Sequence, residues 1–388
     1  MQGTDRLADP ASVGIDEDAL AELRARVQKE VDEGLLPSAQ YAIARNGKLA
    51  AFETFGDATN DSLYCIFSAT KVITSAAAWL LLQEGKLDLD ATVASLIPEF
   101  GSHGKDVITV EQLFTHTGGF PSAPFRPTDW NDKARRLERF SQWTLNWEPG
   151  SQFEYHPTSS MWIIAELIER ITGEDFADFV RNRIALPLGL PELYLGCPES
   201  EHHRVADVCH VGDALTSEDY AEMGIPEPPV TEVTEEVLLR FNLPETRLVP
   251  VPGGGGIASA ADLALFYQGL IGNTASGEKL WSDETLGEAL KVRTGDFTNP
   301  QTGMPVNRAL GVVISGDDKR NFRGFGHANS ERAFGHDGAG GQVAWVDQET
   351  GISFVYCTNG HDRNPIRMGR RGVSLGNRAA VCGLGIAG

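Results

Sequence analysis

A serine and a lysine three positions apart stand where an extended apolar run turns into a helix. The pair is Ser68 and Lys71, and the helix that follows carries apolar residues from Ala76 to Leu82 that can bury it in a core. Side chains at positions i and i+3 of a helix lie about 5–6 Å apart at Cβ, so the lysine can reach the serine hydroxyl. The free N–H groups and the positive dipole end of the helix start favour a neutral lysine and suit an anionic intermediate. This arrangement is typical of an activated serine.

The Ser-x-x-Lys pattern occurs three times, and context separates the three copies. The copies at Ser102 and Ser276 lie in polar, glycine-bearing segments that predict loops, where two flexible side chains are not held together. A simpler interpretation makes Ser68 a helix N-cap and Lys71 a solvated cation. A lysine in the first turn is electrostatically unfavourable for a mere cap, which disfavours that interpretation.

Charge and composition limit the kinds of partner that we expect. The 388-residue chain has a formal net charge of −21, with 33 Lys and Arg against 54 Asp and Glu, so a basic face for nucleic acid or an anionic membrane is not expected. Residues 1–37 lack an apolar core of the signal-peptide type, and no stretch reaches the roughly 18 apolar residues of a membrane helix. Five scattered cysteines predict free thiols. Together these features predict a cytoplasmic location.

The order of the predicted elements indicates the fold class. An amphipathic helix over 16–31 precedes two alternating segments, 39–44 and 49–55, which flank Asn46-Gly47, a strong hairpin signal. Helical spacing then recurs at 72–83, 110–115, 132–144, 159–171, 176–184 and 259–270. Strands return at 310–315, 342–346 and 352–357, the last two as a hairpin, and a helix is expected near Arg371. We therefore expect an α/β (α+β) fold in which helices flank an antiparallel sheet built from both chain ends.

The expected domains are a sheet domain of residues 1–85 and 250–388 and an inserted, mainly helical domain of residues 86–249. The second includes an acidic, proline-rich excursion or lid at about 198–249, with its acidic residues between Glu218 and Glu245. Metal-ligand side chains also gather in this region: Cys197, His202, His203, Cys209 and His210. Their spacing lacks a Cys-x-x-Cys or His-x-x-x-His clamp, so a mobile loop is favoured over a metal site.

Two further segments can complete a site around Ser68. Tyr155 stands where an extended segment gives way to a helix, and a phenol becomes a usable base when a neighbouring ammonium stabilises its charged form. Taken alone, such a tyrosine is more often a core or rim aromatic. The glycines of residues 335–341 lead into an apolar strand, so they allow a substrate to approach closely and do not form a phosphate loop. Within this segment His336 also fits an ordinary strand-end histidine.

Together, Ser68-Ala-Thr-Lys71, Tyr155 and His336-Asp-Gly338 resemble the motifs of the serine β-lactamase and penicillin-binding-protein superfamily. The resemblance is strongest to the class C-like branch that includes the family VIII carboxylesterases. Residues 83–90, 113–119 and 253–262 also look like stretches of that family in the same order, and roughly residues 15–360 are covered.

The resemblance implies acyl transfer to and from a serine, without a cofactor or metal and with a small-molecule ester as partner. Ser68 would be the nucleophile, and Lys71 and Tyr155 would share the general base and acid roles. The backbone N–H groups of Ser68 and Ala339 would form the oxyanion hole. The implied substrate-binding positions are His336, Gly338, Phe120 and Pro157.

Two departures from the family pattern favour esters. Where lactamases carry a side-chain amide two positions after the tyrosine, this chain has Pro157; where they carry a lysine, it has His336, which is mostly neutral at pH 7. Thr158 or Ser159 could partly replace the missing amide, so weak β-lactamase activity stays open. Transesterase or acyltransferase activity and D-amino-acid amidase or peptidase activity also stay open. A non-catalytic scaffold or binding protein is disfavoured because all three chemical groups are retained.

Overall fold

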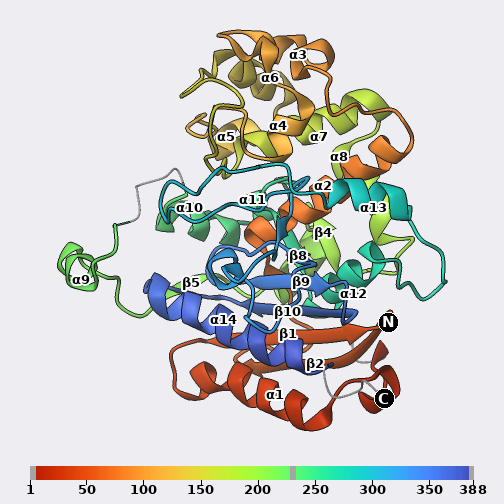
Figure 1. The fold of residues 1–388 in the computed structure, drawn as a ribbon, viewed down its shortest axis with the longest axis vertical. Helices are drawn as coiled ribbons and strands as arrows, with labels where there is room; N and C mark the ends of the chain where they lie inside the picture. The colour runs from red at the N-terminus through yellow and green to blue at the C-terminus, as the bar shows by residue number, and fades with distance from the viewer. Residues whose placement is uncertain (1–5, 228–232, 384–388) are drawn as a thin grey trace.

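A six-stranded antiparallel sheet joins the two ends of the chain (Figure 1). The computed structural model describes residues 6–227 and 233–383. The strands are β1 (Ser38–Arg45), β2 (Lys48–Gly56), β7 (Val313–Ile314), β8 (Ala333–Gly335), β9 (Val343–Asp347) and β10 (Ile352–Thr358). They lie in the order β2-β1-β10-β9-β8-β7, and each neighbouring pair is antiparallel. Because β1 lies beside β10, the sheet is built from both chain ends, which confirms the predicted fold class.

Both predicted hairpins are present. Asn46 and Gly47, which join β1 to β2, have φ angles of 54° and 74°, the left-handed geometry that a two-residue hairpin turn needs. β9 and β10 form the second hairpin through residues 348–351. The strand predicted over 310–315 is shorter than expected, because residues 309–312 form a turn that packs Gly311 against Ser75 of the long apolar helix.

Helices cover both faces of the sheet (Figure 1). α1 (Glu17–Asp32) and α14 (Pro365–Val381) pack together on one face, while α12 (Ala260–Leu270) packs on β1 and β10. The side chains of β1 alternate between two hydrophobic cores. Tyr41 and Ile43 belong to the core that includes residues of α1 and α14, and Ala42 and Ala44 belong to the core that includes residues of α12. All three helices agree with the sequence analysis.

The helices predicted between the two halves of the sheet are also present. They are α2 (Thr70–Gln83), α4 (Val110–Phe114), α6 (Lys133–Gln142), α7 (Ser159–Thr172) and α8 (Phe176–Val180), the last continuing as a π-helical turn over Arg181–Ala185. Elements too short to show a periodic signal were not predicted: α3 (Val93–Leu96), α5 (Pro127–Trp130), α13 (Asp283–Ala289), β3 (Tyr64–Cys65), β4 (Leu193–Leu195), β5 (Cys209–Val211), β6 (Gly256–Ala258) and β11 (Gly360–Asp362). The exact domain boundaries stay a prediction.

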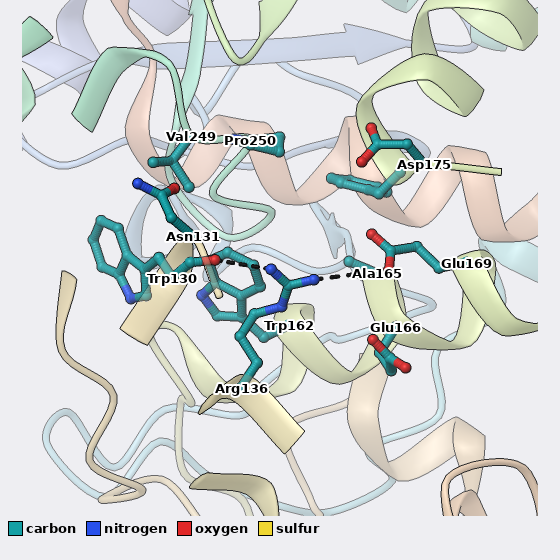
Figure 2. Close-up of a pocket in the computed structure, with 11 residues that line it drawn as sticks. Trp130, Asn131, Arg136, Trp162, Ala165, Glu166, Glu169, Asp175, Val249 and Pro250 are labelled. Atoms are coloured by element: carbon teal, nitrogen blue, oxygen red, sulfur yellow. Dashed lines mark hydrogen bonds and ion pairs between the residues drawn. The ribbon is translucent and has the colours of Figure 1, made fainter. Parts of the chain in front are cut away.

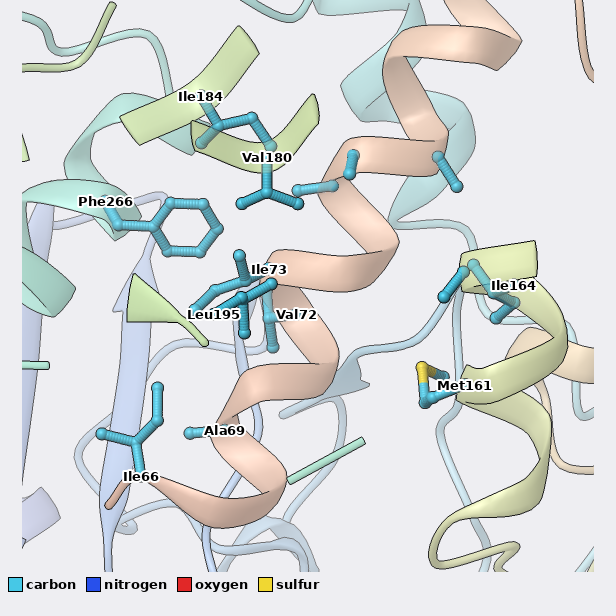
Figure 3. Close-up of a cluster of buried hydrophobic side chains, with 14 of the residues drawn as sticks. Ile66, Ala69, Val72, Ile73, Met161, Ile164, Val180, Ile184, Leu195 and Phe266 are labelled. Carbon is cyan, nitrogen blue, oxygen red and sulfur yellow. The ribbon is translucent and has the colours of Figure 1, made fainter. Parts of the chain in front are cut away.

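Helix α2 is enclosed by protein and places the site (Figure 3). Every residue from Thr70 to Leu81 is buried. On one side, Ala69 and Val72 belong to a cluster with Ile66, Val180, Ile184, Leu195 and Phe266. Met161 and Ile164 of α7 lie on the other side (Figure 3). Lys71 therefore stands on a helix that cannot shift without disturbing the core, and Ser68 stands in the turn that leads directly into it.

The acidic excursion is more ordered than predicted. It contains α9 (Ser217–Met223), α10 (Glu235–Leu239) and α11 (Pro244–Arg247), while residues 228–232 of the predicted lid lie outside the described residues. Phe241, in a 3-10 turn of the same segment, is buried. The five cysteines, all in the described part of the chain, are unpaired. Within residues 6–227 and 233–383, no metal-holding group of three His, Cys, Asp or Glu side chains occurs, and no helix is long and apolar enough to cross a bilayer.

Candidate active site

Ser68 lies in a tight 3-10 turn, Phe67–Ala69, that leads directly into α2. Phe67 has a φ of 44°, which side chains of L-residues disfavour. Its ring packs edge-on against Phe241 and His361, with ring centroids 5.2 and 5.0 Å away. Packing thus stabilises a strained backbone that presents the half-buried Ser68 hydroxyl at the mouth of the helix.

The Lys71 amine is buried and anchored by two backbone carbonyls. Nζ lies 2.7 Å from the carbonyl oxygens of both Pro157 and Gly253, and 3.3 Å from Oγ of Ser68. Carbonyl oxygens only accept, so the two short bonds use N–H groups of the lysine. The contact with Ser68 can then carry a further N–H of an ammonium or the lone pair of an amine. Because Lys71 is 0% exposed, the interpretation of this residue as a solvated cation is wrong.

Tyr155 completes the group around Ser68. It lies in the irregular segment before α7. Its hydroxyl donates to Oγ of Ser68 at 3.0 Å, and Nζ of Lys71 lies 5.1 Å from the centre of its ring. The structure therefore brings the three predicted catalytic residues together at one oxygen atom.

The other two Ser-x-x-Lys copies do not have this geometry. Nζ of Lys105 binds the backbone carbonyl of Ser102 at 2.6 Å, while the Ser102 hydroxyl donates to another carbonyl. Lys279 pairs with Asp283, and Ser276 is exposed. In both copies the lysine binds a group other than the serine hydroxyl, as the loop context predicts.

The glycine run at residues 253–256 allows the close approach of the lysine. A Cβ on Gly253 would lie 3.4 Å from Nζ of Lys71 and 3.2 Å from the Pro157 carbonyl oxygen. Three residues later, the Gly256 N–H donates to the Thr70 hydroxyl of α2 at 2.9 Å. This segment, which the sequence analysis relates to the family, thus supplies a second carbonyl that holds the lysine beside that of Pro157.

Two buried histidines lie behind Tyr155. His156 donates from Nδ1 to the Glu154 carbonyl at 2.6 Å and accepts at Nε2 from the Phe120 N–H at 3.0 Å. His116 accepts at Nδ1 from the His156 N–H, so its Nε2 carries the hydrogen, and that buried atom has no partner among the described residues. Burial lowers the pKa of both rings, to about 3 for His156, so both are neutral at pH 7. The ring centroid of His116 lies 4.7 Å from that of Tyr155.

His336 approaches Tyr155 from the end of β8, with their ring centroids 5.9 Å apart. Its Nδ1 donates to the Asp337 carbonyl at 2.7 Å, so Nε2 is an acceptor, and it is buried without a partner in the described structure. Burial, followed by the positive charges of Arg308 and Lys71, lowers the pKa of His336 well below its usual value. The position that carries a lysine in lactamases is therefore uncharged.

The turn after His336 runs against the backbone just before Ser68. A Cβ on Gly338 would lie 2.3 Å from the carbonyl oxygen of Ile66, so a glycine is required there. Ala339, the next residue, is half-buried, and its N–H makes no backbone hydrogen bond within the described residues. These placements are compatible with an oxyanion hole at Ser68 and Ala339, which stays a prediction.

The two remaining residues predicted to bind substrate contribute backbone groups to the site. The ring of Phe120 is fully buried against Trp143, so it lies in the core and not at the cleft surface. Pro157 is half-buried and contributes the carbonyl that anchors Lys71. Ser159 is buried and donates to the Phe120 carbonyl at 3.3 Å, so its hydroxyl is already engaged and is a poor replacement for the missing amide.

The sequence analysis missed His116, His156 and Arg308 as parts of the site. His116 lies within the stretch 113–119 that resembles the family, but nothing in its spacing relates it to Tyr155. Arg308 stands just before β7, outside every motif, and its guanidinium carbon lies 5.3 Å from the centre of the Tyr155 ring.

A separate cavity of about 170 Å³ lies beside α7 (Figure 2). It is lined by Trp130, Asn131, Arg136, Trp162, Ala165, Glu166, Glu169, Asp175, Phe176, Val249 and Pro250. Arg136 donates to the Trp130 carbonyl at 2.9 Å and lies 5.4 Å from the centre of a Trp162 ring (Figure 2). None of the three residues around Ser68 Oγ lines this cavity.

Known proteins resemble the chain over most of its length. A family model described as Beta-lactamase matches residues 23–374. Esterase/beta-lactamase LipL of Mycobacterium tuberculosis is 27% identical over 320 residues, which cover 77% of this chain and 70% of that protein. A penicillin-binding-protein homologue from Caulobacter crescentus has a TM-score of 0.80 and 26% identity, covering 95% of this chain and 99% of that one. A family VIII carboxylesterase has a TM-score of 0.77 and 25% identity, covering 94% and 99%. These findings confirm the superfamily predicted from the motifs.

We expect the buried histidines to make the fold sensitive to acid. The pKa of His156 is about 3 in the folded chain and roughly 6.5 when unfolded, so below pH 6.5 the unfolded chain binds a proton that the folded chain excludes. This contribution to stability is fully present above about pH 6.5. As the pH decreases below that value, the free energy of unfolding decreases by about 1.4 kcal/mol per pH unit. Replacing His156→Gln should make the pH slope of the unfolding free energy, measured by urea denaturation between about pH 6 and 4.5, shallower by that amount.

The matched control is His203→Gln, which changes an exposed ring and should leave the slope as in the parent chain. Equal slopes in His156→Gln and the parent would contradict the prediction, whatever the absolute stability of the variant.

Proposed function

Because the chain belongs to the beta-lactamase family, we propose that this serine hydrolase cleaves carboxylic esters through a covalent acyl-enzyme on Ser68. The observation that carries the proposal is the joint contact of Oγ of Ser68 with the Tyr155 hydroxyl at 3.0 Å and the Lys71 amine at 3.3 Å. A hydroxyl within reach of two proton-transfer groups is the arrangement that nucleophilic catalysis needs.

In the proposed reaction, Oγ of Ser68 attacks the ester carbonyl carbon while its proton passes to the pair formed by Lys71 and Tyr155. The N–H groups of Ser68 and Ala339 stabilise the oxyanion. The bond to the alcohol then breaks, and the pair returns the proton to the leaving alkoxide. Water repeats the sequence on the acyl-enzyme and releases the acid.

Three features support esters over lactams as substrates. Pro157 offers no side-chain amide, Ser159 is engaged with a backbone carbonyl, and His336 is neutral. An ester needs the nucleophile, the oxyanion hole and an apolar acyl pocket, whereas a lactam also needs partners for its amide and carboxylate. The name of one similar protein, a family VIII carboxylesterase, agrees with this choice, and that of another, an esterase/beta-lactamase, includes both activities. The cytoplasmic location stays a prediction that cell fractionation can test.

Replacing Ser68→Ala should lower ester hydrolysis by about 10⁴-fold or more, because the acyl-enzyme cannot form. The measurement is kcat/KM for a short p-nitrophenyl ester, with circular dichroism to show that the variant is folded. Ser102→Ala, in the copy of the motif whose lysine binds carbonyls, should keep full activity. Undiminished turnover in a folded Ser68→Ala variant would overturn the mechanism.

Lys71→Ala and Tyr155→Phe should each lower kcat by about 10²-fold or more, within or above the usual range for acid–base groups. Both touch the same oxygen, so the double variant should be little worse than either single one. Lys279→Ala, at the exposed lysine paired with Asp283, serves as the control and should be unaffected. Losses that simply multiply in the double variant would show that the two groups work independently.

The choice between esterase and lactamase is tested by comparing substrates. We expect kcat/KM for short p-nitrophenyl esters to exceed that for a chromogenic cephalosporin by at least about 10²-fold, or roughly 2.7 kcal/mol of transition-state binding. A D-amino-acid amide and an added alcohol acceptor extend the panel to amidase and acyltransferase activity. Comparable efficiency on the cephalosporin would refute the ester assignment while leaving Ser68 as the nucleophile.

A further inference from the structure

Arg308 brings a positive charge to the site from outside all of the sequence motifs. Its guanidinium carbon lies 5.3 Å from the centre of the Tyr155 ring and 5.9 Å from that of Phe153. Phe153 and Tyr155 stand two positions apart in the irregular segment before α7, and both rings face the guanidinium. Nη1 of Arg308 is buried and has no hydrogen-bond partner among residues 6–227 and 233–383.

The pairing of β7 with β8 explains how this arginine reaches the site. Val313 lies opposite Gly335 in the antiparallel pair, so residues that precede β7 and residues that follow β8 lie at the same end. A turn over residues 309–312 then places Arg308 beside Val313. Arg308 and His336 therefore approach Tyr155 from the two segments that flank β7 at this end of the sheet.

The guanidinium keeps its charge and has no close counter-ion. Burial lowers the pKa of Arg308, interaction with the charged forms of Tyr155 and Asp337 raises it, and an arginine stays protonated in proteins. Within the described chain, no carboxylate lies within 4.0 Å of it as an ion pair. Asp337 is exposed; the surrounding protein raises the pKa of its carboxyl group, and the charge of Arg308 lowers it.

The other titratable groups around Tyr155 are neutral or basic apart from Asp337. From the start of α2 come Ser68 and Lys71, from the segment after α4 comes His116, and from the end of β8 comes His336. The charge of Arg308 is a cause, second to burial, of the lowered pKa values of both histidines. Nζ of Lys71 and Cζ of Arg308 lie at nearly equal distances, 5.1 and 5.3 Å, from the centre of the same phenol ring.

We propose that Arg308 is a positioning residue that supplies the fixed positive charge stabilising the phenolate form of Tyr155, the form able to take the Ser68 proton. The inference rests on the proposed function and assigns the base role to Tyr155. The proton moves from Oγ of Ser68 to the phenolate oxygen as the bond to the carbonyl carbon forms. It then moves from Tyr155 to the leaving alkoxide as the ester C–O bond breaks, which restores the phenolate. Arg308 thus replaces, from another segment of the chain, the charge that lysine carries in the family at the position of His336.

The test compares Arg308→Gln and Arg308→Lys over a range of pH with a neutral p-nitrophenyl ester. An opposite charge within about 4–6 Å favours the charged form of a group by roughly tenfold or more, so Arg308→Gln should lower kcat/KM near neutral pH by about 10- to 100-fold. The acidic limb of its pH profile should move to higher pH by about one unit or more, and activity should recover as pH rises. Arg308→Lys should keep most of the activity and the parent profile.

Arg293→Gln is the matched control, because Arg293 is a half-buried arginine of the adjacent segment that pairs with Glu111 and Glu288. Thermal unfolding of each variant separates loss of charge from loss of folding. A uniform loss at every pH, or an unchanged profile in Arg308→Gln, would overturn the proposal. A loss confined to an anionic ester such as a p-nitrophenyl hemisuccinate would also overturn it, because Arg308 would then bind substrate.

The rate at which a fluorophosphonate labels Ser68 gives a second readout that needs no ester turnover. If the parent protein hydrolyses no ester but its labelling rate shows the same dependence on Arg308 and pH, the proposed ester hydrolysis fails while the role of Arg308 stands. If esters are hydrolysed but neither rate nor labelling responds to Arg308→Gln, only the role of Arg308 fails.

Discussion

The amine of Lys71 ties together three parts of the chain that the sequence keeps far apart. It projects from α2, binds the Pro157 carbonyl before α7 and binds the Gly253 carbonyl before β6. A buried amine without acceptors is costly, so any movement that separates these segments loses both hydrogen bonds at once. The anchors are neutral dipoles, so they hold the nitrogen in place without forcing a permanent charge on it. The proton-transfer role proposed for Lys71 needs both properties.

The neutrality of the surrounding histidines follows from the same exclusion of water. His116, His156 and His336 are buried, and their lowered pKa values keep all three uncharged at neutral pH. Positive charge near Ser68 is thereby left to Lys71 and Arg308. His116 and His336 each keep one ring nitrogen without a partner in the described structure, one a donor and the other an acceptor. Polar atoms of this kind, in rings that lie beside Tyr155, suit a site that has yet to receive a polar ligand.

The parts of this site that could be predicted from sequence are those whose chemistry is local. Ser68 and Lys71 share one helix turn, so spacing alone places them together, and the apolar run of α2 explains why they are rigid. Asn46-Gly47 likewise determines its hairpin within two residues. Phe120 shows the limit of motif reasoning, because its neighbourhood was predicted correctly but its ring points into the core. Short strands such as β8 carry too few residues for a periodic signal, although β8 positions His336, which follows it directly.

Arg308 shows why the remaining features could not be predicted. Its place beside Tyr155 depends on the register of β7 against β8 and on the turn that shortens β7, neither of which a single sequence reveals. Compared position by position with the family motif, the chain has lost a cation at His336. In three dimensions, the guanidinium arrives from the segment on the far side of β7, and its carbon lies 5.3 Å from the centre of the phenol ring. An electrostatic requirement acts on a point in space, and segments that are far apart in the chain can bring a charge to the same point. The loss of a charged residue from a motif is therefore evidence for changed chemistry only when the neighbouring segments have been inspected as well.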